Sequence, residues 1–285
     1  MKQNLDLRPS PIAGQWYPGD SKRLASTVDE YINNAGLPDI KGEVVAIISP
    51  HAGHVYSGGV AGYAFAAISG MTPETVAIIS PMHQPYRDSL LTSGHDAYQT
   101  PLGAVPIDKD ALQKLDQDLV AELGFSLKPV RNDREHSLEI ELPFLQRALD
   151  KSFSLLPVMV RDQSERVARC LGFSLARILK DRDALLVAST DLSHFYPQEV
   201  ANKFDRELLK RIESFDPGAV LQAEEDGKGF ACGRAAVAAV LWAARELGAD
   251  KVQILKYATS GDVSGDYRQV VGYGAAVITR IKEDS

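Results

Sequence analysis

Short runs of apolar residues recur along the chain, each bounded by polar or turn-forming residues. Six of them are rich in valine, isoleucine, leucine and alanine, which is typical of strands covered on both faces of a sheet. They span residues 43–49, 75–80, 153–160, 184–190, 252–259 and 270–278. Pro157 interrupts the third run, and because proline cannot donate to a ladder we expect that strand at an edge or a bulge.

Helical periodicity fills the segments between these runs, over residues 20–34, 60–68, 108–123, 137–149, 163–180, 199–213 and 234–247. Strands that alternate with helices predict an α/β fold with a central, mainly parallel sheet flanked by helices. No low-complexity linker divides the chain, so we expect one domain over residues 1–285. The stretches 81–106 and 261–273 read as long loops, which are usually functional in a compact domain.

Composition excludes several classes of protein. The formal net charge is −7 and no Lys/Arg stripe stands out, so nucleic acid is not an expected partner. The two cysteines, Cys170 and Cys232, lie far apart, which argues against a disulfide framework and for a reducing compartment. Neither a signal-peptide core nor an apolar run of about 18 residues is present, so we expect a cytoplasmic protein without a membrane partner.

Histidines follow the predicted strands at similar positions. VAIISPH ends at His51, VAIISPMH ends at His83, and LLVAST runs directly into the segment DLSH, which ends at His194. In open α/β sheets, ligands bind beyond the carboxyl ends of the strands, where these imidazoles would converge. Each histidine could instead only bond a loop carbonyl, but the repeated arrangement favours a shared metal site for His51 and His83.

Cys232 precedes an alanine-rich helical segment, where the helix dipole would favour a thiolate suited to metal ligation or nucleophilic attack. A structural role for this cysteine is an equal alternative. Cys170 lies within a helical pattern and reads as a packing residue.

Asp191 and His194 share the segment TDLSHF, in which the aspartate could orient the imidazole for acid–base chemistry. Alternatively, Asp191 caps the helix that begins near residue 199 or forms a local turn.

Three further histidines and two glutamates have weaker signals. His136 precedes a helical segment with Glu139 and Glu141 near its first turn, where the helix dipole alone could explain both carboxylates. His54 and His95 lie in the glycine-containing loops HAGHVYSGG and TSGHDAY, and the two histidines could line the mouth of a pocket. Phosphate-binding glycine motifs and a GxSxG elbow are absent from the sequence, so a metal or thiol site is the best remaining chemistry.

Eight motifs follow one another along the chain: AGQWYPGD, SPHAGHVYSGG, SPMHQ, EHSLEIELPFLQ, STDLSHF, ACGR, TSGDVSGD and VGYGA. In these motifs and their order the chain resembles the Memo family, also called AmmeMemoRadiSam system protein B. This resemblance implies a fold similar to class III extradiol dioxygenases, in which two histidines and one acidic residue hold Fe(II). By position, His51 and His83 match the histidine ligands and Cys232 replaces the carboxylate. His194 matches the acid–base residue, which Asp191 would assist.

The resemblance implies a metal-dependent oxidoreductase that acts on a small aromatic or phenolic molecule. Iron is the first choice of metal, with copper or zinc as alternatives because a thiolate is a softer ligand than a carboxylate. Two other functions stay open: a non-catalytic module that binds a ligand or a phosphotyrosine peptide, and a zinc-dependent hydrolase. The family context also implies a radical-SAM pathway partner.

Overall fold

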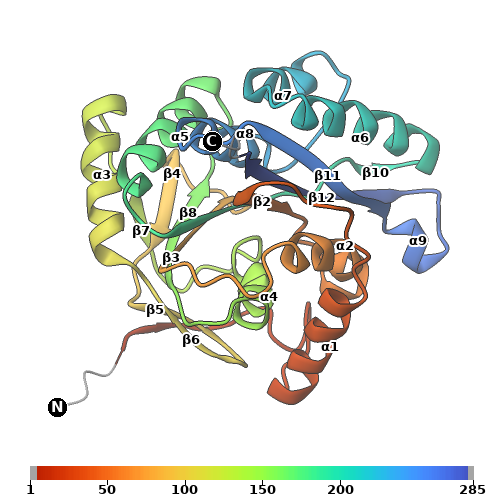
Figure 1. Ribbon diagram of the computed structural model, residues 1–285, viewed down its shortest axis with the longest axis horizontal. Helices are drawn as coiled ribbons and strands as arrows, with labels where there is room; N and C mark the ends of the chain where they lie inside the picture. Colours follow the sequence, from red (N-terminus) through yellow and green to blue (C-terminus); the bar gives the residue numbers. More distant parts are fainter. Residues whose placement is uncertain (1–4, 282–285) are drawn as a thin grey trace.

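The apolar runs form one large mixed sheet in the computed structural model, which describes residues 5–281 (Figure 1). Within this range the sheet has nine strands, in the order β10-β12-β2-β9-β3-β8-β4-β7, with β11 paired to β12. Their bounds are β2 (Glu43–Ser49), β3 (Thr75–Pro81), β4 (Leu90–Ser93), β7 (Lys128–Val130), β8 (Ser154–Val160), β9 (Ala184–Ser189), β10 (His194–Tyr196), β11 (Lys251–Thr259) and β12 (Val270–Arg280).

The centre of the sheet is parallel and its margins are mixed. Strands β2, β9, β3 and β8 run parallel to one another, as the alternation of strands and helices predicted. Strand β12 is antiparallel to β2, β10 and β11, and β4 is antiparallel to β8. The β11–β12 connection is short, and short connections join antiparallel neighbours. The α/β class is therefore confirmed, and the parallel pairs are those of the central strands and the marginal pair β4–β7.

The expectation that Pro157 marks an edge strand or a bulge is wrong. Strand β8 lies between β3 and β4, and its register with β3 is continuous through Pro157. The carbonyl of Pro157 accepts a hydrogen bond from the Thr92 hydroxyl at 2.7 Å, beyond the short ladder that β4 forms with β8. The Thr92 hydroxyl thus bonds β8 at Pro157, where the ladder with β4 has ended and the proline has no N–H to donate.

Helices cover both faces of the sheet (Figure 1). Alternate strand residues pack on opposite sides: Ile47 contacts the apolar cluster under α1, α2 and α4, while Ala46 and Ile48 contact the cluster under α3, α5, α6, α7 and α8. None of the helices between residues 5 and 281 has the length and apolar character of a membrane span. The bounds are α1 (Ser21–Asn33), α2 (His54–Ala66), α3 (Lys109–Leu123), α4 (Leu142–Ala148), α5 (Glu165–Leu179), α6 (Gln198–Glu213), α7 (Pro217–Glu225), α8 (Arg234–Glu246) and α9 (Gly261–Ser264).

Two segments differ from the sequence-based expectation. Helix α2 begins at His54, inside the glycine-rich stretch that had suggested a loop. Its glycines serve helix packing, since a Cβ at Gly62 would lie 2.3 Å from the carbonyl oxygen of Tyr31 in α1. The stretch 81–106 is not a long loop, because it contains β4, β5 (Ala97–Thr100) and β6 (Gly103–Pro106). Strands β5 and β6 form a small second sheet with β1 (Leu7–Arg8).

Arg8 ties this small sheet to the middle of the chain through a buried ion-pair network. Its guanidinium donates to Asp133 at 2.8 Å and to Glu139 at 2.6 Å, and all three side chains are almost fully buried. It also donates to the carbonyl oxygen of Glu135 at 2.7 Å. Tyr17 donates its hydroxyl to the same Glu139 carboxylate at 2.7 Å. The segment between residues 133 and 139 is therefore held by a strand that lies far away in the sequence.

Arg8→Met should destabilise the protein by about 3–5 kcal/mol, because it leaves two buried carboxylates without their cation. Urea unfolding followed by circular dichroism measures this change. The matched control is Arg147→Met, which breaks a partly exposed pair with Asp29 and should cost about 1 kcal/mol or less after solvent screening. Equal losses in the two variants would contradict the importance of the buried network.

Candidate metal centre

Three neighbouring parallel strands end level with one another at the carboxyl edge of the sheet. Ser49 of β2 pairs with Ser189 of β9, and Ile79 of β3 pairs with Ala188. His51 and His83 follow β2 and β3, so they lie on either side of the end of β9. Their ring centroids are 5.4 Å apart. The structure thus brings together the two histidines that the sequence singled out.

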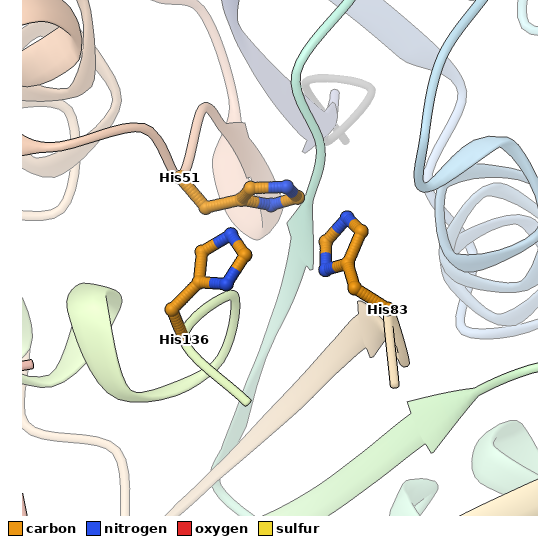
Figure 2. Close-up of side chains that lie close together, drawn as sticks. All are labelled: His51, His83 and His136. Carbon is orange, nitrogen blue, oxygen red and sulfur yellow. The ribbon is translucent and has the colours of Figure 1, made fainter. Parts of the chain in front are cut away.

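A third imidazole, that of His136, completes the cluster (Figure 2). Its centroid lies 5.5 Å from that of His51 and 4.7 Å from that of His83, and one ligand nitrogen from each ring lies within 4.8 Å of the others. Nitrogens bound to one ion at about 2.1 Å lie about 3–3.5 Å apart, so small rotations of the rings would close the set. The three histidines can therefore hold a metal ion.

Burial keeps the imidazoles of His51 and His136 in the neutral form that binds metal. Desolvation lowers the pKa of His51 well below its ordinary value, and the nearby His136 and His83 lower it further. Desolvation also lowers the pKa of His136 to about 4, with a smaller contribution from His83. At neutral pH each of these two rings keeps an unprotonated nitrogen for a ligand bond.

Glu135 organises two of the three histidines, and sequence reasoning missed it. Its carboxylate accepts the Nδ1–H of His83 at 2.9 Å and the backbone N–H groups of His83, His136 and Ser137. Burial opposes its ionisation, but the hydrogen bonds from His83 and Ser137 and the charge interactions with His83 and His136 together hold the Glu135 pKa far below the usual range. Because Nδ1 of His83 is engaged, Nε2 is left for the metal. The only signal in the sequence was its position directly before His136.

His51 is oriented by a second buried carboxyl group. Its Nδ1 lies 2.9 Å from the Ser189 hydroxyl, which in turn lies 2.6 Å from Glu141. Desolvation raises the pKa of Glu141 to about 8. The helix dipole alone, one of the two alternatives for Glu139 and Glu141, does not account for them, because both are buried and bonded to side chains, Glu139 to Arg8 and Glu141 to Ser189.

Cys232 lies at the same edge of the sheet. Its Sγ is 3.1 Å from Nε2 of His51 and accepts the backbone N–H of Asp191 at 3.3 Å. The expected thiolate does not form in the metal-free protein, because burial and the neighbouring Asp191 raise the pKa of the thiol. Desolvation outweighs the dipole of α8, which begins two residues later at Arg234. The thiol remains within reach of an ion bound by His51.

Asp191 and His194 are not bonded in the way the sequence suggested. The Asp191 carboxyl accepts the backbone N–H of His51 at 2.8 Å, and its pKa is raised to about 7 by burial. His194 instead donates Nδ1–H to the carbonyl of Leu192 at 2.8 Å. Nor does Asp191 cap α6, whose N-terminal cap is Pro197. Asp191 therefore supports the turn that carries His51.

A close contact between α6 and β12 anchors the segment that carries His194. The buried Asp205 accepts the backbone N–H of Ser193 at 2.9 Å, and the N–H of Gly272 donates to the Ser193 carbonyl at 2.9 Å. A Cβ at position 272 would lie 1.9 Å from the Asp205 carboxylate. The first glycine of VGYGA is thus required for this contact, a role that the sequence alone did not reveal.

The cluster opens into a cavity of about 700 Å³. His51, His83, His136, Asp191 and His194 supply polar groups to its wall, and its apolar lining comes from Trp16, Val55, Tyr56, Phe195, Val271 and Tyr273. Ser264, Asp266 and Gln269, from the predicted loop over residues 261–273, line it as well.

Three residues considered from the sequence lie away from this wall. His54 is buried at the start of α2 and bonds the carbonyl of Ile140, and His95 is buried against Asp6 and Asn132. Cys170 packs, partly buried, against the apolar cluster under α5. His54 and His95 therefore have structural roles and do not lie at the mouth of the pocket.

Removing any of the three clustered imidazoles should remove most of the bound metal. We expect His51→Ala, His83→Ala and His136→Ala each to purify with little metal after reconstitution, measured by inductively coupled plasma mass spectrometry. Glu135→Gln should weaken metal affinity by about 10–100-fold, because it orients His83 without binding the ion.

The matched control is His194→Ala, which removes an imidazole from the same cavity and should retain metal. Cys232→Ser decides the remaining ligand position. A loss of metal as large as that in His136→Ala would make Cys232 an equal ligand. Full retention in His136→Ala would contradict the three-histidine set.

Glu141 should make the metal-free protein less stable as the pH rises. Its pKa is raised in the folded protein from 4.5 to about 8, so between these values the unfolded chain ionises while the folded protein keeps its proton. The stability that protonated Glu141 contributes is therefore complete below pH 4.5 and is lost as the pH approaches 8, with a slope of up to about 1.4 kcal/mol per pH unit. Glu141→Gln should flatten the plot of unfolding free energy against pH over this window. Glu246→Gln, on the exposed surface of α8, should not.

Comparison with known proteins identifies the family to which the sequence is similar. The pattern of the Memo-like protein family matches residues 8–277. A "MEMO1 family protein" of Nitrosopumilus maritimus is 35% identical over 273 residues, which cover 94% of this chain and 98% of the relative. A relative from Methanopyrus kandleri is 34% identical over 96% of this chain and 99% of its own. Another from Methanococcoides burtonii is 35% identical over 95% and 100%.

A solved structure resembles the fold at low sequence identity. The crystal structure of an uncharacterized protein from Escherichia coli K12 superimposes with a TM-score of 0.51 at 13% identity, covering 83% of this chain and 100% of that one. At this identity the likeness concerns the fold alone. The resemblance inferred from the sequence motifs is confirmed by the family match over residues 8–277. This protein therefore belongs to the Memo-like family.

Proposed function

We propose that this protein is a metal-dependent oxidoreductase, related in fold to the non-haem iron extradiol dioxygenases, that acts on a small aromatic or phenolic molecule. The observation that carries the proposal is the convergence of His51, His83 and His136 at the inner end of a cavity that also exposes His194. A metal ion held by three imidazoles would leave coordination positions for a substrate and a second reactant.

The cavity wall supports a planar substrate. Trp16, Tyr56, Phe195 and Tyr273 contribute aromatic side chains, and the volume of about 700 Å³ is ample for a substituted ring. The Trp16 ring also lies over His136, with centroids 4.2 Å apart. A substrate that reaches the cluster would pass aromatic surface before it meets the imidazoles.

His194 is the residue proposed to move a proton. Its Nδ1–H is committed to the Leu192 carbonyl, so Nε2 is the free nitrogen, and burial lowers the pKa of the ring below its ordinary value. A neutral imidazole with a free Nε2 can accept the proton of a phenol and return it later in the reaction. Asp191 acts through His51 instead, by holding its backbone.

Iron is the metal we propose, with copper as the alternative redox metal. Imidazole suits iron, copper and zinc alike, so the donor set fits the group without selecting one member. When bound, a redox metal would supply Lewis acidity and electron transfer to this site. Cys232 is the anionic ligand available to complete the set, because a bound cation would favour its thiolate.

A second candidate is a zinc-dependent hydrolase, favoured by the all-imidazole cluster. Three histidines with an open fourth position are a known catalytic zinc arrangement, and Glu135 is occupied by His83 rather than directed at the ion. In that case His194 would accept the proton of the attacking water.

The test is anaerobic metal reconstitution followed by an oxygen-uptake screen against catechols. Oxygen uptake with iron-loaded or copper-loaded protein is the expected result, and His194→Ala should lower the rate by about 10²–10⁴-fold while retaining metal. Retention of zinc alone, with ester hydrolysis and no oxygen uptake, would favour the hydrolase. Binding of a phosphotyrosine peptide without turnover by any metal form would favour a binding module.

A further inference from the structure

Phe195 combines two unfavourable features at one position. Its φ is 62°, in the left-handed region that a bulky side chain rarely adopts, and its side chain is 68% exposed. It is also the extra residue of a bulge, because His194 and Tyr196 pair with the adjacent residues Val271 and Val270 of β12. Strain and aromatic exposure at one residue indicate a functional rather than a packing role.

The surroundings prevent Phe195 from relaxing. On one side, Ser193 is bonded to Asp205 and Gly272, and His194 is bonded to the Leu192 carbonyl. On the other side, the ring of Tyr196 stacks on that of Phe230 at a centroid distance of 5.8 Å. The main chain is thus anchored before and after the bulge, which directs the Phe195 ring outward beside His194.

The ring belongs to the wall of the cavity that contains the histidine cluster. Phe195 lines this cavity together with His51, His83 and His136, and its centroid lies 5.8 Å from that of His194 at an angle of 71°. Val55 and Tyr56, at the start of α2, line the same cavity and are 64% and 45% exposed. Exposed apolar side chains that gather at one cavity mark a surface that a ligand covers.

We infer that Phe195 determines the specificity of this cavity by packing its ring against the flat face of a bound aromatic ligand, together with Val55 and Tyr56. The inference rests on the proposed function, since it assumes that the ligand approaches the histidine cluster. It further predicts that the cavity binds a molecule with a planar ring more tightly than an open-chain molecule with the same metal-binding groups. Stacked or edge-to-face aromatic contacts supply that selectivity.

The experiment compares two probes on the full-length, Fe(II)-loaded protein under anaerobic conditions. 4-Nitrocatechol has a planar ring and a chelating pair of oxygens, whereas acetohydroxamate chelates without a ring. Phe195→Asn removes the ring but keeps a residue that tolerates positive φ, so it should fold with a melting temperature at or above that of the wild type. It should bind 4-nitrocatechol about tenfold more weakly, equivalent to about 1.4 kcal/mol, with acetohydroxamate affinity unchanged.

Two further variants act as controls. Phe195→Tyr keeps the aromatic plane and should bind 4-nitrocatechol like the wild type. Tyr267→Asn removes a 49% exposed aromatic side chain that does not line the cavity, and should change neither affinity. Equal weakening of both probes in Phe195→Asn, or no weakening at all, would overturn the inference. A loss of 4-nitrocatechol affinity in Phe195→Tyr as large as that in Phe195→Asn would overturn the inference too.

Failure of the proposed function is visible separately. Wild-type protein that binds acetohydroxamate but not 4-nitrocatechol would refute an aromatic substrate, and the inference about Phe195 with it. Wild-type protein that retains no iron and binds neither probe would refute the iron centre itself.

Discussion

The site depends on the parallel register of β2, β9 and β3. Because these strands end level with one another, the residues that follow them meet at one edge of the sheet. His51 and His83 come from the two outer strands of the three, and Asp191 comes from the middle one. A shift of one residue in either pairing would turn alternate side chains to the opposite face and separate the histidines. The alternating apolar residues that pack on both faces prevent such a shift.

Buried carboxyl groups adapt this edge to bind a cation without being ligands themselves. Glu135 binds His83 and the backbone of the following turn, and Glu141 reaches His51 through Ser189. His83 and His51 therefore each have Nδ1 committed to these groups, while Nε2 is not bonded to them. Arg8 extends the support outward, because it holds the carbonyl of Glu135 from a strand near the N-terminus. The imidazoles are positioned by layers of contacts that begin far from the cavity.

Part of this arrangement could be predicted from the sequence, and the rest could not because it depends on contacts between distant segments. Continuous apolar runs identified the central strands, and the position of a histidine after two of them predicted where His51 and His83 lie. His136 could not be predicted in the same way, because it reaches the cluster on a segment placed by the contact of Arg8 with Asp133, 125 positions away. The protonation of Cys232 was also mispredicted, since a local helix rule cannot register how deeply the fold buries a thiol. Pro157 and Gly272 likewise depend on contacts made by other strands.

The position of β12 in the chain determines when the strand that leads to His51 is completed. Strand β12 ends at Arg280, yet it pairs with β2, the strand that presents His51. During synthesis, β2 lacks this neighbour until β12 has been made, and the Ser193–Gly272 contact forms equally late. Long-range pairings of this kind close slowly and leave strand edges exposed in the meantime. The strand that leads to His51 is therefore completed only when β12 has been made, although all three clustered histidines precede residue 137.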